Sequence, residues 1–128
     1  MSLQFSAILA AIFAIALVPL TLQVGIKRVS TGIFFGDGGN KDLARRRAAQ
    51  SNFLDHVPLF LLVFALCEMN GAGPPVLFGA GGCMLLGRAF HAFSMLATDG
   101  TGNSRAFGMI LTLLAHLGVA GYLLYVLL

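Results

Sequence analysis

Residues 45–64 read RRRAAQSNFLDHVPLFLLVF, and this stretch decides the fold. It begins with three arginines and ends in an apolar run, so one helix carries Asn52, Asp55 and His56 to the edge of an apolar medium or into it. A charged side chain at the centre of a bilayer costs about 2.5–3.5 kcal/mol on insertion scales, so such residues face a bundle interior and mark sites. The helical spacing from Arg45 through Asn52 to Asp55 and His56 places these polar residues on one face.

The composition of the whole chain is that of a membrane protein. Its 128 residues are 58% hydrophobic and 10% charged, whereas about 25% of the residues in ordinary soluble domains are charged. This length predicts one domain, residues 1–128. The net charge of +3 is small and its basic residues are localised, which indicates a membrane surface and no nucleic acid. The two cysteines lie in apolar segments and the three histidines are scattered along the chain. Neither set has the spacing of metal ligands, so we expect no bound metal ion.

Four apolar segments are long enough to cross a bilayer, which takes about 20 apolar residues. The first has no Asp, Glu, Lys or Arg before Lys27, so it lacks the positive charge of a signal peptide, and we expect it to remain in the mature protein. Asn40 or Asp42 is the candidate cap of the second helix. The prediction is an all-α integral membrane protein, an up-and-down bundle of four transmembrane helices at about residues 3–27, 43–67, 75–97 and 105–127.

The basic residues predict the orientation of this bundle. Six of the eight Lys and Arg lie in or beside the first loop, Arg105 borders the third, and the second loop has none. The positive-inside rule therefore places the first and third loops in the cytoplasm and both termini on the other side. A site formed by the polar parts of the second, third and fourth helices would open toward the cytoplasm.

The third helix carries a second polar face. Arg88, His91 and Met95 lie at positions i, i+3 and i+7, and Arg105 begins the fourth helix. Arg88 is about nine residues inside its span, roughly 13 Å at the α-helical rise. A cation at this depth needs a carboxylate, and Asp55 is the acid in reach, so we expect an Arg88–Asp55 pair that is either architectural or part of a site. Together these residues predict a polar cavity of net positive charge between the helices, which would suit an anionic ligand.

Several motifs resemble those of the MAPEG family, the membrane-associated proteins of eicosanoid and glutathione metabolism. The matches to the signatures of the second, third and fourth helices are Arg45, Ala49-Gln50, Asn52, Asp55 and Pro58, then Gly87-Arg88-Ala89-Phe90-His91, then Asn103-Ser104-Arg105-Ala106. The first-loop sequence Gly36-Asp37-Gly38-Gly39 is similar to that of small bacterial members. Motif order and spacing agree over nearly the whole chain, and Asp55 stands in place of a longer glutamate.

The resemblance implies a homotrimer in a membrane, such as a bacterial inner membrane, that binds glutathione as co-substrate between adjacent subunits. Arg105 matches the arginine that stabilises the glutathione thiolate, which would attack a hydrophobic electrophile dissolved among the membrane lipids. A thiol with a pKa of about 8.5 is mostly protonated at neutral pH. Each unit by which a site lowers this pKa corresponds to about 1.36 kcal/mol of preferential stabilisation of the thiolate. The implied glutathione-binding residues are Arg28, Arg45, Gln50, Asn52, Asp55, His56, Arg88 and His91.

Three functions remain open at this point. The leading one is a glutathione transferase or peroxidase, the second is a non-catalytic protein that binds lipid or glutathione, and the third is a small proton or solute pathway through the intramembrane polar residues. His116, alone on an apolar face, is expected to form a helix-to-helix hydrogen bond. Arg46 and Arg47 are candidate anchors to anionic lipid.

Overall fold

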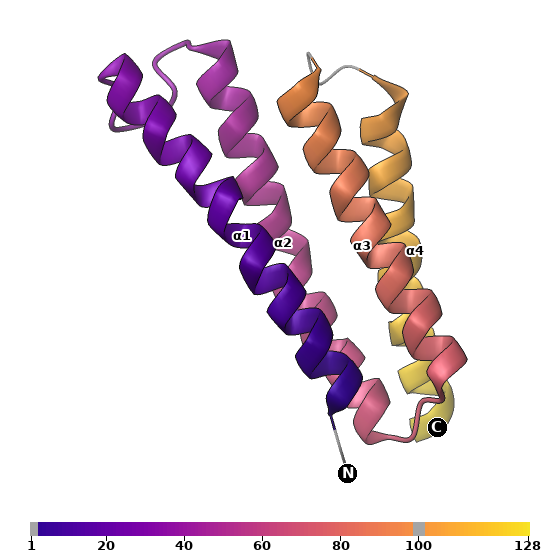
Figure 1. Ribbon diagram of the computed structural model, residues 1–128. Helices are drawn as coiled ribbons and strands as arrows, with labels where there is room; N and C mark the ends of the chain where they lie inside the picture. Colours follow the sequence, from indigo (N-terminus) through magenta and orange to yellow (C-terminus); the bar gives the residue numbers. More distant parts are fainter. Residues whose placement is uncertain (1–2, 99–101) are drawn as a thin grey trace.

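The computed structural model describes residues 3–98 and 102–128, and within these ranges it contains four α-helices. All four are long and apolar enough to cross a membrane. The predicted all-α bundle of four transmembrane helices is therefore confirmed. The helices are α1 (Gln4–Thr31), α2 (Lys41–Met69), α3 (Pro74–Ala97) and α4 (Asn103–Leu127) (Figure 1).

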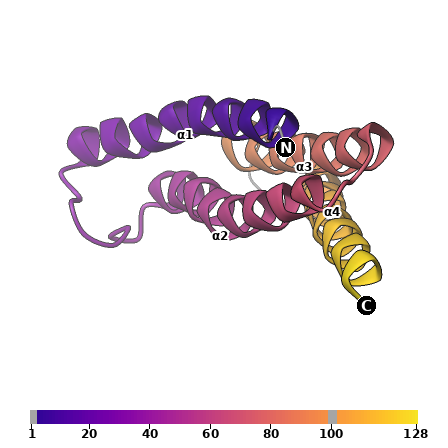
Figure 2. The ribbon, with the colours of Figure 1, turned by 90° about the horizontal axis from the view of Figure 1, so that it is seen from below.

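The helices pack as two antiparallel pairs. α3 and α4 have the most extensive contact, α1 packs on α2, and α2 joins the pairs through α3 and α4. The end of α1, the start of α2, the end of α3 and the start of α4 lie at one end of the molecule, while the α2–α3 connection, the start of α1 and the end of α4 lie at the other (Figure 1). Seen from below, α4 crosses the other helices at an angle (Figure 2). The first and third loops thus share one side, as the topology requires.

Several helix ends differ from the expected ones by two to four residues, and two of them have a clear local cause. α2 begins at Lys41 because the side chain of Asn40 accepts a hydrogen bond from Leu43 N at 3.0 Å, so Asn40 is its cap. α1 continues to Thr31, four residues beyond the expected position 27, and ends where Gly32 adopts a left-handed conformation with φ 70°. Charged residues mark the edge of the apolar span, but they do not stop the backbone hydrogen bonding of a helix.

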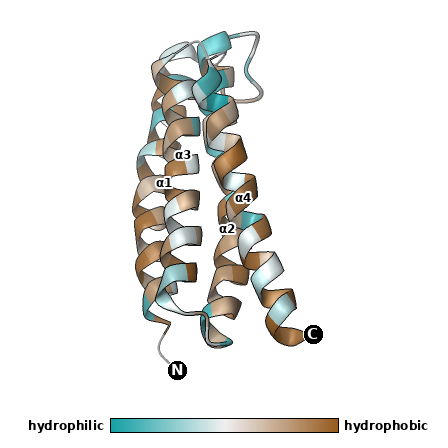
Figure 3. Ribbon diagram, turned by 90° about the vertical axis from the view of Figure 1, so that its right-hand side faces the viewer, coloured by the Kyte–Doolittle hydropathy of each residue, from teal (hydrophilic) through white to brown (hydrophobic). Residues whose placement is uncertain are grey.

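The core follows one face of α2, and the outer surface is apolar. Phe60 and Phe64 are fully buried, while outward side chains such as Ile15 and Leu117 are more than two-thirds exposed. Hydrophilic residues concentrate at the end with the first and third loops (Figure 3). This distribution suits a hydrocarbon environment, since exposed apolar side chains there face lipid tails instead of water.

Two glycines bring the backbones of α3 and α4 together. A Cβ atom placed on Gly108 would lie 2.7 Å from Gly87 O and 2.7 Å from His91 N, and one placed on Gly87 would lie 2.7 Å from Thr112 Oγ1. Hydrogen replaces the side chain at both positions, so the helices touch without an intervening layer. This contact places the backbone of Gly87 and His91 directly against α4.

Glu68, near the end of α2, caps the beginning of α1. Its carboxylate accepts hydrogen bonds from Phe5 N at 3.0 Å, Ser6 N at 2.8 Å and Ser6 Oγ at 2.5 Å. Leu3 at the start of α1 provides no side-chain cap of its own. The carboxylate therefore satisfies amide groups that have no partner within the helix and faces the positive end of its dipole.

Replacing Glu68 with alanine is expected to fray the first turn of α1, because its amides lose their acceptor. Loss of a capping side chain costs about 0.5–2 kcal/mol. Hydrogen–deuterium exchange of the Phe5 and Ser6 amides measures the effect as faster exchange. Asn70→Ala is the matched control, since the Asn70 side chain donates to Leu66 O in its own helix. Equal protection in the two variants would contradict the capping role.

Candidate functional site

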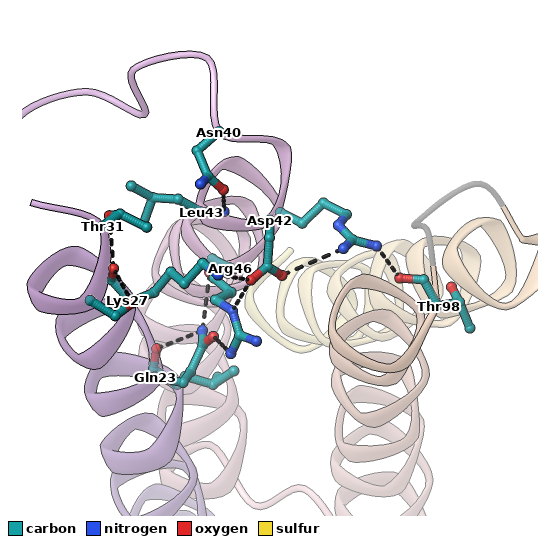
Figure 4. A network of polar contacts seen from close by, with 11 residues as sticks. Gln23, Lys27, Thr31, Asn40, Asp42, Leu43, Arg46 and Thr98 are labelled. Carbon is teal, nitrogen blue, oxygen red and sulfur yellow. Dashed lines mark hydrogen bonds and ion pairs between the residues drawn. The ribbon is translucent and has the colours of Figure 1, made fainter. Parts of the chain in front are cut away.

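Most cations of the chain gather at the end of the bundle that carries the first and third connections, called the basic end from here on. Asp42 ties three of them together, with its carboxylate oxygens 2.9 Å from Lys27 Nζ, 3.1 Å from Arg46 Nε and 3.4 Å from Arg45 Nη2. Figure 4 shows this network between α1 and α2. The cations of the basic end are Lys27, Arg28, Lys41, Arg45, Arg46, Arg47 and Arg105.

The Asp42 network also reaches the neighbouring helices. Arg46 Nη1 donates to Gln23 Oε1 on α1 at 3.1 Å, and Arg45 Nη1 donates to the carbonyl of Thr98 beyond the end of α3 at 2.5 Å (Figure 4). Sequence reasoning treated Asp42 only as a cap or dipole residue. The signal for its larger role was the spacing to the arginines at i+3 and i+4, which lie on the same helix face.

Arg88 lies deep between α2 and α3, where its side chain is only 5% exposed. Its Nη1 donates to the backbone carbonyl of Asn52, at 3.2 Å, and to Asn52 Oδ1. Its Nε and Nη2 have no hydrogen-bond partner among the described residues. This buried guanidinium thus keeps donors free on the side that Asn52 does not occupy.

The expected Arg88–Asp55 ion pair is wrong. Every ion pair among residues 3–98 and 102–128 involves Asp42, and Asp55 is exposed, with Ser51 Oγ donating to it at 3.4 Å. The physical reason is the helical rotation: three residues turn about 300°, so Asp55 points roughly 60° away from Asn52 around the α2 axis. The amide, and not the acid, faces α3.

Two histidines, His56 and His91, lie close to this guanidinium, and His116 packs on the first of them. The rings of His56 on α2 and His116 on α4 contact each other at a centroid distance of 5.6 Å. His91 is buried, and it lies close enough to Arg88, Arg105 and His56 for their charges to interact. His116 Nδ1 lies 2.9 Å from Thr112 O in its own helix. The expected helix-to-helix hydrogen bond of His116 is thus replaced by ring packing on α2.

The structure brings Asn52, His56, Arg88 and His91 together and leaves the other candidates apart. Arg45 is held at the basic end as described above. Three of the remaining four have separate surroundings within one chain: Arg28 donates to Ile33 O and Gly36 O, Gln50 donates to Thr21 Oγ1 on α1, and Asp55 is exposed. Arg105 is also exposed, but it lies near enough to His91 for their charges to interact.

A polar groove of about 430 Å³ runs along the outer face of α2. Asp55 lies about 14 residues from the start of this helix, roughly 21 Å along it, which is near the middle of a bilayer-length segment. An exposed carboxylate at that depth is unfavourable in lipid, so this face needs a polar cover. The groove is lined by Asp37, Ala44, Arg47, Ala48, Gln50, Ser51, Leu54 and Asp55.

Sequence reasoning missed the Gly87–Gly108 contact and the capping role of Glu68. Gly87 and Gly108 are 21 positions apart in the sequence, and Glu68 is more than 60 positions from Phe5 and Ser6. No local sequence pattern identifies contacts across such separations. Within the described ranges, no group of three or more His, Cys, Asp or Glu is arranged to hold a metal ion.

Comparison with known proteins gives one family and two similar proteins. The model of the MAPEG family matches residues 6–125. The chain is 27% identical over 88 residues to the inner membrane protein YecN of Escherichia coli K12, covering 69% of this chain and 67% of YecN, and it matches YecN of Escherichia coli O6:H1 to the same extent. No solved structure matches significantly.

The family match, the inner-membrane relative and the four spans agree with one another. The protein is an integral multi-pass membrane protein, as the sequence predicted. Because the family model extends from the first turn of α1 to the last turns of α4, the whole bundle is matched. The chain therefore belongs to the MAPEG family.

Proposed function

We propose that this protein is a glutathione-dependent membrane enzyme of the transferase or peroxidase type. The observation that carries the proposal is the buried Arg88 guanidinium, which has a neutral partner in Asn52 and free donors at Nε and Nη2. Buried charges in proteins are paired or hydrogen-bonded, so an anionic ligand would complete this site. Glutathione supplies carboxylates and a polar peptide backbone, and family membership supports it as the ligand.

The proposed functional unit is a homotrimer. The outer face of α2 exposes Asp55 and Arg47 along a membrane-spanning helix, and Arg105 is exposed at the start of α4. Neighbouring copies would remove these charges from lipid, and the MAPEG resemblance supplies the number three. A ligand seated between copies would then meet residues that point away from one another within a single chain.

Each candidate residue receives a role on this basis. Gln50, Asn52 and Asp55 bind the polar groups of the tripeptide, Arg28 and Arg45 meet its carboxylates at the basic end, and Arg88 forms the floor with His56 and His91 beside it. Arg105 stabilises the thiolate, which attacks a hydrophobic electrophile arriving from the bilayer. The excess of cations at the basic end supports a site that faces the cytoplasm.

The test begins with glutathione binding to the protein purified in detergent, together with the ultraviolet absorbance of the thiolate. Arg88→Met is expected to weaken binding by about 30-fold or more, because truncating one partner of a buried charge pair costs about 2–5 kcal/mol. Lys41→Met removes an exposed cation of the basic end, away from Arg88, and is the matched control, with affinity expected to stay unchanged.

The outcomes separate the remaining functions. A thiolate signal and conjugates with a panel of hydrophobic electrophiles support the enzyme, whereas glutathione binding without either indicates a non-catalytic binding protein. Equal affinity of the Arg88→Met and Lys41→Met variants would contradict the assignment of Arg88. Absence of glutathione binding by the folded protein would overturn the proposed function as a whole.

A further inference from the structure

The connection between α1 and α2 exposes two adjacent aromatic side chains. Phe34 is 64% exposed and Phe35 is 92% exposed. Large apolar side chains are driven out of water by the hydrophobic effect, so an exposed pair at the tip of a short connection requires an apolar or amphipathic environment. Neither residue belongs to the candidate site described above.

The backbone around these phenylalanines is held in a defined position. Arg28 Nη1 donates to Ile33 O at 2.9 Å and to Gly36 O at 3.2 Å, so carbonyls on both sides of the pair are tied to the last turns of α1. The connection doubles back beside the end of α1 before it rises to α2 (Figure 1). In the view from below it projects beyond the α1–α2 pair, away from α3 and α4 (Figure 2).

The height of this anchor point along α1 coincides with lipid-facing side chains. Ile26 is 68% exposed and Val29, next to Arg28, is 75% exposed. On a membrane-spanning helix, exposed aliphatic side chains of this kind face the hydrocarbon region. Arg28 therefore ties the backbone on both sides of Phe34 and Phe35 to the part of α1 that carries these exposed aliphatic side chains.

The charge of the same region complements an anionic surface. Residues 27–47 contain six Lys or Arg and two Asp, which leaves four positive charges. Three of the cations share Asp42, while Arg28 is bonded to neutral carbonyls and Arg47 is exposed. Anionic headgroups attract such a cluster, and aromatic side chains next to it can lie at the boundary between headgroups and acyl chains.

We propose that the Phe34–Phe35 tip inserts into the headgroup region of the leaflet at the basic end and that the surrounding cations favour anionic lipid there. The loop thus binds the membrane surface and sets the height of the basic end relative to the bilayer. The insertion depends on the loop alone, so it stands apart from the identity of any ligand bound near Arg88.

Tryptophan fluorescence tests this directly, because the chain contains no tryptophan. Phe35→Trp gives a protein with a single reporter, which is placed in vesicles whose lipids carry bromine near the upper end of the acyl chain. We expect blue-shifted emission, loss of most of the intensity to brominated lipid, and little quenching by aqueous iodide. Phe34→Trp provides a second reporter on the same tip.

Two reference proteins calibrate the result. Val29→Trp reports a lipid-facing position on α1, and Asn103→Trp reports an exposed position at the start of α4, at the same end of the molecule. The tip is expected to resemble the Val29 reference. Red-shifted emission with strong iodide quenching, as expected at Asn103, would overturn the insertion, because it places the tip in water. Blue-shifted emission that neither quencher reduces would also overturn it, because protein then covers the tip.

A separate quenching experiment tests the preference for anionic headgroups. Brominated phosphatidylglycerol and brominated phosphatidylcholine are each added as a minor fraction to otherwise identical vesicles. Stronger quenching of Phe35→Trp by the phosphatidylglycerol at low ionic strength, lost at high ionic strength, supports attraction to anionic lipid. Equal quenching by the two lipids would overturn the headgroup preference.

Discussion

Replacing Gly108 with alanine is expected to separate α3 from α4 and destabilise the bundle. The new Cβ would lie 2.7 Å from two backbone atoms, Gly87 O and His91 N, and neither can move aside unless the helix moves with it. Inserting a methyl group into a tightly packed contact costs about 1–3 kcal/mol, and more where the obstacle is rigid. Helical circular dichroism followed through a thermal unfolding transition in detergent measures the loss.

A control for this substitution lies in the same helix. Gly118 has no atom within 4 Å of an added Cβ, so Gly118→Ala is expected to leave the stability unchanged or raise it slightly. Gly87→Ala should resemble Gly108→Ala, and the double variant should lose less stability than the two single effects combined, because one separation of the helices relieves both clashes. Similar transition temperatures for Gly108→Ala and Gly118→Ala would contradict the close approach.

Replacing Arg105 with alanine is expected to lower turnover about 10²–10³-fold under the proposed function, the usual effect of removing one placed electrostatic donor. The lost interaction is made mainly with ionised sulfur, so the affinity for glutathione should fall much less than the rate. Arg105→Lys should recover only part of the activity, since an ammonium on a flexible stem does not reproduce the planar guanidinium. Turnover, glutathione affinity and thiolate absorbance are measured on each folded variant.

The competing role for Arg105 is an anchor to lipid headgroups at a helix end. In that case its loss lowers stability or membrane insertion and leaves the rate constants of the folded protein unchanged. Asn103→Ala, two residues earlier in the same exposed first turn, is the matched control. Normal turnover with a normal thiolate signal in the Arg105→Ala protein would end the thiolate-stabiliser assignment.

The membrane-spanning architecture was accessible from the sequence because the bilayer imposes its own rules. The thickness of the hydrocarbon sets a minimum span length, and the energy of placing charge in lipid confines Lys and Arg to the ends. These constraints act on each segment separately, without reference to its neighbours. For the same reason Asn40 could be named as a candidate cap, since capping involves only the first turn of its own helix.

The convergence of the second and third helices was also readable, because helical spacing assigns residues to faces. Asn52, His56, Arg88 and His91 do lie together. The sequence did not predict which residue of α2 would bind the Arg88 guanidinium. Asn52 and Asp55 differ by about 60° around α2, and the choice between them depends on how α2 is rotated against α3.

Only the tertiary structure decided those rotations and the distant contacts that produce them. The Gly87–Gly108 approach sets the crossing of α3 and α4, and Glu68 joins the end of α2 to the start of α1 across more than 60 residues. Helix rotation follows from packing summed over whole interfaces, where many weak contacts compete. A sequence period specifies which side chains share a face, whereas the direction in which that face points is set by the neighbours against which it packs.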